Sequence, residues 1–199
     1  MKRTFDFTAS LLGLIALSPF LLIIAVFVII YHGRPIFFRQ KRPGLHGEPF
    51  YLIKFRSMTN ETDESGNLLP NEKRLTKIGK FLRSTSLDEF PELINVIKGE
   101  MSLVGPRPLL MEYLPRYNDF QKRRMEAKPG ITGWSQINGR NTLTWDDKFK
   151  LDVWYVENQS FWLDLQILLK TCFKVLKREG ISHQGDVAMP HFYGNKKHE

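Results

Sequence analysis

The feature that most constrains this chain is a long uncharged segment near its start. Residues 7–33 contain no Asp, Glu, Lys or Arg. A hydrocarbon core about 30 Å thick needs about 20 consecutive apolar residues in a helix, and residues 11–31 are long enough to provide them. The apolar run is longer than that of a cleaved signal peptide, and no small-residue cleavage site follows it. The segment therefore predicts a membrane helix.

Two residues in the middle of this segment predict a bend. Pro19 has no backbone N–H and clashes with the carbonyl four residues earlier, so the helix is expected to kink there. The hydroxyl of Ser18 can bond a carbonyl that the proline leaves free. Basic residues flank the segment on both sides, beginning with Lys2 and with Arg34, which places both ends in the cytoplasm. We predict a re-entrant anchor over residues 1–33, with a single straight span as the alternative.

The remaining residues, 34–199, are enough for one compact domain with its own core. The formal net charge of the chain is +8, which suits phosphates, nucleotides or anionic lipid head groups, with nucleic acid as a competing partner. No pair of His or Cys residues has the spacing of zinc ligands. The single cysteine, Cys172, cannot form an internal disulfide and is expected to be a buried thiol on the apolar face of a helix.

The sequence pattern of the domain predicts an α+β fold rich in helices. Residues 35–39 and 48–55 are short aromatic and β-branched runs on either side of a Pro-Gly turn at 41–44, which predicts a β-hairpin. Residues 59–71 are polar and predict a surface loop. Apolar residues at helical spacing among lysines and arginines, at 75–82 and again at 165–176, predict amphipathic helices that lie at the membrane interface.

An acidic pair, Asp88 and Glu89, lies where a further helix is predicted to begin. Ser86 followed three residues later by Glu89 has the pattern of a capping box, and the helix dipole favours acidic residues at this end, so capping alone explains the pair. Free backbone amides and Arg83 would also attract phosphate to the same place. Aspartate is a nucleophile in phosphoryl chemistry, so phosphoryl transfer is the second interpretation.

Two loops are predicted to present arginine from a rigid backbone. Pro106 and Pro108 flank Arg107, and such a loop holds a guanidinium for bidentate contact with a phosphate or a planar base. Taken alone, it is also compatible with an ordinary turn. A second loop, residues 128–140, ends in Arg140. Two such loops near an acidic pair predict an anion clamp.

These motifs together resemble those of the bacterial monotopic phosphoglycosyl transferases, the small sugar transferases that start lipid-linked glycan assembly. The resemblance covers nearly the whole chain and rests on many matches in the same order. It departs from the family at Ser135, where relatives often have alanine. The matching segments are Ser18-Pro19, Arg42-Pro43-Gly44 and residues 54–58, 86–89, 101–108, 128–134, 138–140 and 151–156.

The resemblance implies a two-step displacement. Asp88 attacks the sugar-linked phosphate of a UDP-sugar, UMP leaves, and undecaprenyl phosphate then takes the phosphosugar. It also implies Mg²⁺ held by Asp88, a supporting role for Glu89, and an arginine buttressed by Asp152. The substrate-binding positions that it implies are Arg83, Pro106, Arg107, Pro108, Arg140 and Asp152.

The resemblance extends to the donor sugar and the location. Residues 107–118 resemble members that use UDP-N,N′-diacetylbacillosamine for protein N-glycosylation, with UDP-GalNAc or UDP-GlcNAc as alternatives for polysaccharide assembly. The expected location is the cytoplasmic face of the bacterial inner membrane, with no nucleic-acid partner. Two other classes remain open: a membrane-tethered basic binding module that does not depend on Asp88, and a glycosyltransferase that releases UDP instead of UMP.

Overall fold

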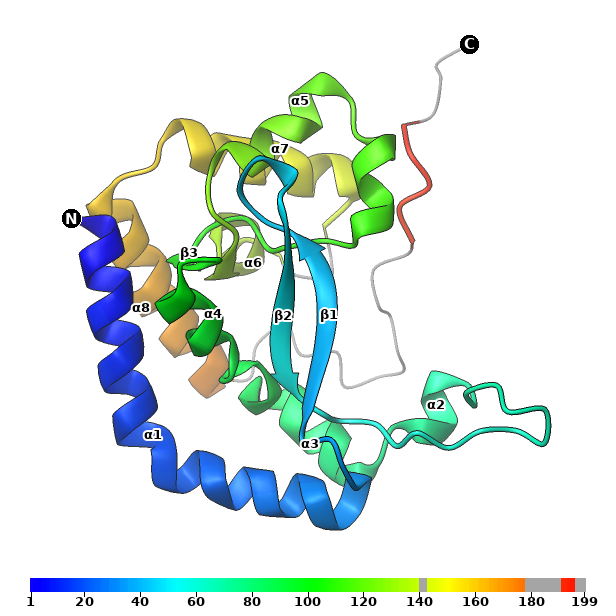
Figure 1. Ribbon diagram of the computed structural model, residues 1–199. Helices are drawn as coiled ribbons and strands as arrows, with labels where there is room; N and C mark the ends of the chain where they lie inside the picture. Colours follow the sequence, from blue (N-terminus) through cyan, green and yellow to red (C-terminus); the bar gives the residue numbers. More distant parts are fainter. Residues whose placement is uncertain (140–142, 178–190, 196–199) are drawn as a thin grey trace.

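A computed structural model describes residues 1–139, 143–177 and 191–195 of the chain. The described part is an α+β fold rich in helices, as predicted (Figure 1). Short 3₁₀ turns connect the elements at Leu45–Gly47, Leu87–Glu89, Met111–Arg116 and Arg123–Glu126. The helices are α1 (Lys2–His32), α2 (Asn71–Arg74), α3 (Lys77–Ser84), α4 (Glu92–Lys98), α5 (Asp119–Lys122), α6 (Trp134–Ile137), α7 (Trp145–Glu157) and α8 (Phe161–Lys177), and the strands are β1 (Phe37–Pro43), β2 (Pro49–Phe55), β3 (Ser102–Val104) and β4 (Gly130–Thr132).

Helix α1 bends sharply near its middle (Figure 1). Pro19 lies inside the helix and has no N–H to donate to the carbonyl of Ile15, four residues earlier. The hydroxyl of Ser18 donates to that carbonyl instead, at 2.8 Å. The predicted kink and the predicted role of Ser18 are confirmed. The helix is long and apolar enough to cross a membrane, and only 11 % of its most apolar stretch is buried in the protein.

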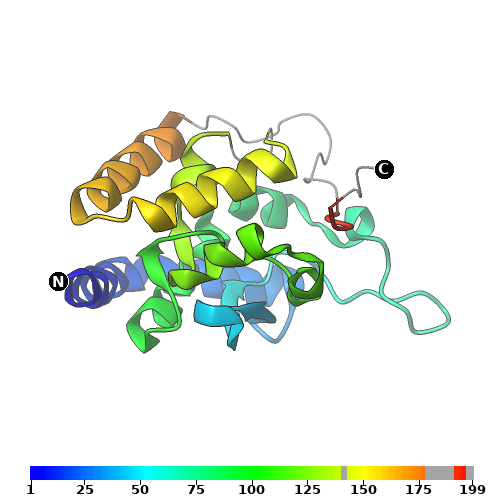
Figure 2. The ribbon, with the colours of Figure 1, turned by 90° about the horizontal axis from the view of Figure 1, so that it is seen from above.

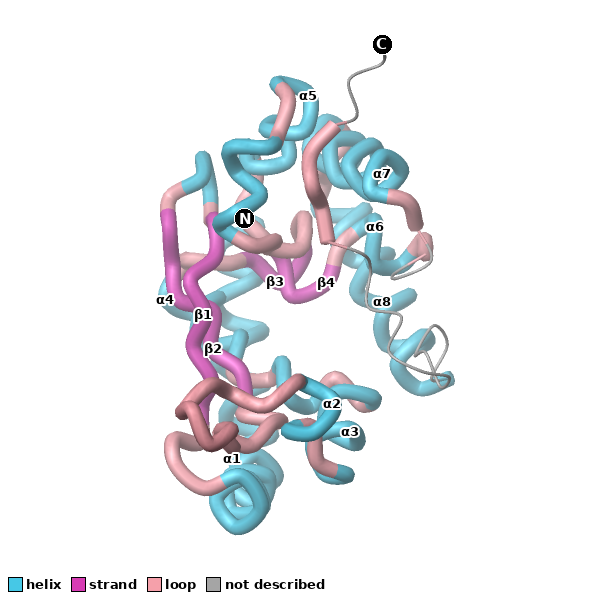
Figure 3. Tube along the Cα trace, turned by 90° about the vertical axis from the view of Figure 1, so that its right-hand side faces the viewer, coloured by secondary structure: helices cyan, strands magenta, loops and turns pink. Residues whose placement is uncertain are grey.

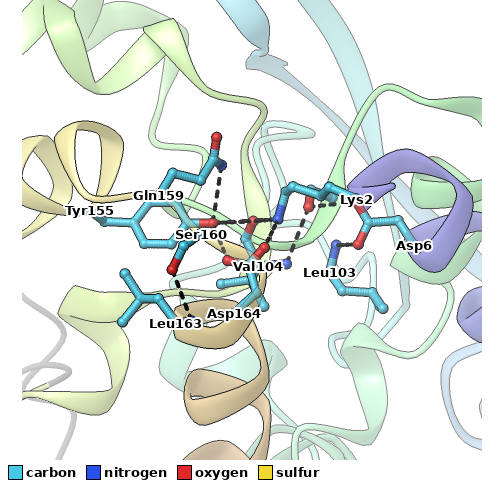
Figure 4. A network of polar contacts seen from close by, with 10 residues as sticks. Lys2, Asp6, Leu103, Val104, Tyr155, Gln159, Ser160, Leu163 and Asp164 are labelled. Atoms are coloured by element: carbon cyan, nitrogen blue, oxygen red, sulfur yellow. Dashed lines mark hydrogen bonds and ion pairs between the residues drawn. The ribbon is translucent and has the colours of Figure 1, made fainter.

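The start of α1 is fastened to the domain by a polar network (Figure 4). Lys2 makes an ion pair with Asp164 on α8, which also accepts a hydrogen bond from the Tyr155 hydroxyl at 2.6 Å. One turn later, Asp6 accepts a hydrogen bond from the hydroxyl of Ser102 on β3 at 2.7 Å. Because Asp6, Tyr155 and Asp164 are buried, these bonds compensate for the water that the groups lose.

The second half of α1 packs on the domain through its apolar side chains. Ile24 and Val28 are buried in a cluster with Leu82 of α3 and the end of β2. At the last residue of the helix, the imidazole of His32 lies 2.7 Å from the hydroxyl of Thr76. Both ends of the bent helix are therefore held by the domain that follows it.

The predicted β-hairpin is confirmed. Strands β1 and β2 are antiparallel, in a register that runs from Phe37 opposite Phe55 to Pro43 opposite Pro49 (Figure 3). The first strand is longer than predicted, because it continues through the part that was predicted as a turn. Pro43 ends the strand, where no ladder hydrogen bond needs its missing N–H. The turn begins at Gly44, whose N–H donates to the carbonyl of Glu48.

The centre of the domain holds a short parallel pair, β3 and β4, that the sequence did not predict. Ser102 lies opposite Gly130, and Val104 lies opposite Thr132. Helices α7 and α8 lie on the opposite side of the molecule from the hairpin (Figures 2 and 3). Val104 packs there with Ile167 of α8 in a buried cluster. The loops that follow β3 and β4 therefore start from adjacent backbone positions.

The predicted capping box at Ser86 is wrong. Ser86 has a left-handed backbone, with φ of +56°, and its side chain makes no capping hydrogen bond. The chain first forms the 3₁₀ turn Leu87–Glu89, and α4 begins only at Glu92. The carboxylate of Glu89 is drawn away from the helix start by Lys54 and Arg107. Capping therefore does not explain the acidic pair.

The predicted burial of Cys172 is also wrong, because this cysteine is exposed. Helix α8 turns a different side inward, with Asp164 and Ile167 buried. The bonds of Asp164 to Lys2 and Tyr155 fix that orientation. Several large apolar side chains of α8 are left exposed as a result: Phe161, Trp162, Leu169 and Phe173.

Candidate active site

Asp88 is a buried carboxylate without a direct partner among the described residues. It lies in the 3₁₀ turn between α3 and α4, and no group in the described part of the chain makes a hydrogen bond or ion pair with it. Burial raises the pKa of Asp88 to about 6, and the charge of Glu89 adds to this. Lys54, Arg83 and Arg107 act in the opposite direction. A desolvated, unpaired carboxylate near three cations is well suited to attack an anionic phosphate.

Glu89 is held quite differently from its neighbour. The guanidinium of Arg107 makes an ion pair with it and donates to both of its oxygens, and Nζ of Lys54 lies 2.6 Å from Oε1. Burial alone would raise the pKa of Glu89, but Arg107 and Lys54 outweigh it and hold this pKa well below its ordinary value. Glu89 therefore stays charged and fixes two cations beside Asp88.

A third carboxylate, Glu92, completes the group. It is 2 % exposed, and one of its oxygens lies 3.1 Å from Nζ of Lys54. Burial raises the pKa of Glu92 to about 7, with Lys54 lowering it and Glu89 raising it. Glu92 was not among the predicted site residues. The pairing with Lys54 comes from the hairpin, which no local pattern places against α4.

One amide holds the hairpin against the helix that follows the acidic pair. Asn95 of α4 is completely buried; its oxygen accepts a hydrogen bond from the N–H of Ile53 at 3.1 Å, and its nitrogen donates to the carbonyl of Tyr51 at 2.8 Å. These two bonds fix the position of β2 along α4. They therefore place Lys54, the next residue of the strand, beside Glu89.

The two predicted arginine loops lie against each other. The N–H of Gly105 donates to the carbonyl of Thr132 at 2.9 Å, and the N–H of Gly130 donates to the carbonyl of Pro106 at 3.1 Å. A Cβ atom on Gly130 would lie 2.0 Å from the nitrogen of Gly105, so only glycine permits this approach. The close packing fixes the loop from which Arg107 reaches Glu89.

Asp152 supports the loop of Arg107 through Arg124, and it is 1 % exposed. It accepts two hydrogen bonds from Arg124, at 3.1 and 2.7 Å, and one from the hydroxyl of Ser135 at 2.6 Å. Arg124 also donates to the backbone carbonyl of Arg107 at 2.7 Å. Asp152 thus buttresses an arginine and does not line the cavity described below. Arg124 and Ser135 were not predicted to take part, because their pairing joins distant segments.

A cavity of about 340 Å³ opens beside Glu92 and Arg107. Burial lowers the pKa of Arg42 to about 10 and that of Lys148 to about 8, and the charge of Arg107 adds to both shifts. Both groups remain largely charged at neutral pH. A cavity of this size with several cations suits a small anionic ligand. Its lining residues are Arg42, Leu52, Lys54, Glu92, Arg107, Pro108, Leu109, Leu110, Tyr113, Trp145 and Lys148.

The other predicted site residues have the following positions. Arg83 lies on α3, donates to the hydroxyl of Ser57 at 2.9 Å, and is close enough to Asp88 to lower its pKa. Pro106 is buried in the loop packing, and Pro108 lines the cavity. Arg140 lies outside the described residues.

The predicted magnesium site would depend on the carboxylates near Asp88. Within the described residues, no group of three or more His, Cys, Asp or Glu side chains could hold a metal ion. Magnesium on phosphates commonly needs only one or two protein carboxylates, and substrate oxygens and water complete its shell. Asp88, which has no protein partner among the described residues, fits that requirement. Magnesium stays a prediction.

Comparison with curated proteins finds sugar transferases. The chain is 56 % identical to the uncharacterized sugar transferase EpsL of Bacillus subtilis, over 98 % of this chain and 96 % of that protein. It is 41 % identical to an undecaprenyl-phosphate galactose phosphotransferase of Salmonella typhimurium and 44 % identical to a UDP-glucose:undecaprenyl-phosphate glucose-1-phosphate transferase of Klebsiella pneumoniae. These two alignments cover 90 % and 87 % of this chain, but only 41 % and 39 % of the relatives.

The family comparison covers most of the chain. The pattern described as bacterial sugar transferase matches residues 1–178, which include the bent helix, the hairpin, the acidic pair and both loops. This agrees with the resemblance drawn from the motifs. The relatives named above are not named for diacetylbacillosamine, so they do not support this sugar in particular as the donor. The chain belongs to the bacterial sugar transferase family.

Proposed function

We propose that this enzyme transfers a sugar 1-phosphate from a UDP-sugar to undecaprenyl phosphate and releases UMP. The observation that carries the proposal is the contrast between the two adjacent carboxylates. Glu89 is paired with Arg107 and Lys54, whereas Asp88 is buried and unpaired among the described residues. The names of the Salmonella and Klebsiella relatives support the reaction class, with undecaprenyl phosphate in both.

The first step is an attack by a carboxylate oxygen of Asp88 on the sugar-linked phosphorus of the donor. A phosphorus–oxygen bond to Asp88 forms, the bond to the bridging oxygen breaks, and UMP leaves with that oxygen. In the second step, a phosphate oxygen of undecaprenyl phosphate attacks the same phosphorus, and the Asp88 carboxylate leaves. The enzyme therefore returns to its starting state, and the product is a lipid-linked sugar diphosphate.

The cations around Asp88 serve both steps. Negative charge moves onto UMP as it leaves, and preorganised cations stabilise such charge without having to reorganise. Lys54 and Arg107 are held by Glu89, Arg83 lies beside the pair, and Arg42 and Lys148 line the cavity. We assign the cavity to the donor and not to nucleic acid, because its volume of about 340 Å³ suits a small molecule.

Magnesium belongs to this proposal. Asp88 would hold it together with phosphate oxygens of the donor, and the ion would supply charge neutralisation at the diphosphate. The residues of the chain bind and orient the donor around it. Activity that is retained after exhaustive chelation would refute this part alone.

The identity of the donor sugar is the most specific part of the proposal. UDP-N,N′-diacetylbacillosamine, and with it a role at the start of N-linked glycoprotein assembly, rests only on the likeness of residues 107–118. The relatives are named for galactose and glucose, and UDP-GalNAc and UDP-GlcNAc remain alternatives. All five donors should therefore be tested side by side.

We further propose that α1 is a re-entrant anchor in the bacterial inner membrane, with the domain on the cytoplasmic face. Its sharp bend, its exposed apolar surface and the exposed aromatic residues of α8 support this (Figure 1). Labelling of cysteines placed at Lys2 and Arg34 in intact cells would test it. Both should be protected from an impermeant external reagent, and labelling of the first would indicate a straight span.

The experiment that tests the reaction is nucleotide release from detergent-solubilised protein with magnesium, undecaprenyl phosphate and the five UDP-sugars. Asp88→Asn should abolish UMP release and the trapping of labelled phosphosugar on the protein. Asp119→Asn makes the same chemical change at a fully exposed carboxylate and should leave the rate unchanged. Release of UDP would indicate glycosyl transfer. Turnover by Asp88→Asn would refute the nucleophile, and no release with any donor would support the binding-module alternative.

A further inference from the structure

The C-terminal segment of the described chain, residues 191–195, lies beyond the part that the family pattern matches. It runs alongside the 3₁₀ turn Met111–Arg116 and α5 (Figures 1 and 3). Phe192 is 3 % exposed and is buried with Tyr113 and Phe149 in one apolar cluster. A terminal segment that contributes a buried ring to a core cluster is part of the fold.

Phe192 contacts the two aromatic residues that line the cavity. Its ring centroid lies 5.7 Å from that of Tyr113, edge to face, and 5.3 Å from that of Trp145. Tyr113 and Trp145 also contact each other edge to face, at 5.5 Å. Each of the three rings contacts the other two. Of the three, Tyr113 and Trp145 line the cavity and Phe192 does not. The orientation of this aromatic wall therefore depends on a ring from the far end of the chain.

Polar contacts fix the segment on both sides of Phe192. The imidazole of His191 lies 3.2 Å from the hydroxyl of Tyr113 and 3.0 Å from Nη1 of Arg116. Arg116 also donates to the carbonyl of Phe192. Asn195 accepts a hydrogen bond from the side chain of Gln121 at 2.5 Å and donates to the carbonyl of Arg116 at 3.3 Å. These bonds hold the ring of Phe192 in one place against the wall.

We propose that Phe192 is a positioning residue for donor binding: through Tyr113 and Trp145 it sets the aromatic wall against which the nucleotide or sugar of the donor packs. The inference rests on the proposed function of the cavity. Planar bases stack on aromatic rings, and sugars pack against their faces, so a displaced wall weakens the hold on the donor. None of the contacts of residues 191–195 described above involves Asp88 or Glu89, so the chemical step should be spared.

The test compares three variants in steady-state kinetics with the preferred UDP-sugar. Phe192→Ala should raise the KM for the donor about tenfold or more and leave kcat within about threefold, since it weakens binding and not the chemical step. His191→Ala removes the contacts to Tyr113 and Arg116 without emptying the cluster, and should raise KM about three- to fivefold. Tyr193→Ala is the matched control, because the ring of Tyr193 is 84 % exposed, and its KM should stay within about twofold.

A second readout separates this inference from the proposed function. The affinity for UMP, measured by calorimetry on folded protein, should fall about tenfold in Phe192→Ala and little in Tyr193→Ala. If the wild type does not release UMP from any donor, the proposed function fails, and UMP affinity still decides the role of Phe192. Wild-type KM and UMP affinity in both Phe192→Ala and His191→Ala would overturn the inference. A fall in kcat at constant KM would overturn it as well. Phe192→Leu, which keeps most of the apolar volume, provides the same test if the alanine variant does not fold.

Discussion

Asp152→Asn should destabilise the protein strongly, although this residue lies outside the cavity. Its side chain and that of Arg124 are 1 % and 2 % exposed, and three hydrogen bonds end on the two carboxylate oxygens. The substitution keeps the shape of the side chain but removes its charge. Arg124 is then a buried cation without a counter-ion, and such a loss costs about 3–5 kcal/mol in free energy of unfolding.

This cost can be measured as a change in melting temperature. For a chain of this size, each kcal/mol shifts the transition by about 2–4 °C, so the expected fall is about 6–20 °C. Thermal unfolding can be followed by tryptophan fluorescence in detergent. Activity at low temperature should persist at a reduced level, because Arg124 also holds the carbonyl of Arg107. Ser135→Ala removes one of the three bonds and should cost less.

A double variant tests whether the unpaired charge of Arg124 causes the loss of stability. Arg124→Met with Asp152→Leu replaces the whole buried pair by apolar groups, which is often neutral or stabilising. Its melting temperature should return towards that of the wild type, while its activity stays low because the bond to Arg107 is gone. A melting temperature of Asp152→Asn within about 2 °C of the wild type would contradict the argument, as would full activity of the double variant.

Two further predictions concern pH and backbone packing. Because the pKa of Asp88 is raised to about 6 and only the carboxylate attacks, kcat/KM for the donor should fall about tenfold from pH 7 to pH 5 and level off above pH 7; a flat profile from pH 8 to pH 5 would contradict this. Gly130→Ala places a Cβ atom 2.0 Å from the nitrogen of Gly105 and should abolish activity and lower the melting temperature, whereas in Gly13→Ala the nearest atom among the described residues is on Leu93, at 3.8 Å, and stability should not fall.

Local sequence patterns predicted the structural elements that neighbouring residues in the chain determine. The bend of α1 follows from Pro19 and from a serine one residue before it, and both can be read along the chain. The hairpin follows from two β-rich runs around a turn. The acidic pair was located for the same reason, since Asp88 and Glu89 are neighbours in a recognisable motif.

What the sequence did not predict depends on pairing between distant segments. The strands β3 and β4 have three residues each, too few to show a period, and exist because glycines allow two loops to meet. Ser86 has the pattern of a helix cap, yet the pull of Lys54 and Arg107 on Glu89 prevents the capping box. Cys172 lies on an apolar stripe, but buried polar bonds turn the other side of α8 inward. In each case a tertiary contact outweighed a local preference.

The attachment of α1 at both of its ends has a geometrical consequence. A helix that is held at Lys2 and again around Val28 keeps its bend at a fixed position relative to the domain that carries the acidic pair (Figure 1). The proposed lipid acceptor would then have to bring its phosphate to a site whose position relative to the bend is fixed. In the two-step reaction and membrane anchoring proposed above, a change in bilayer thickness should therefore alter the rate of the second step and leave the first unaffected.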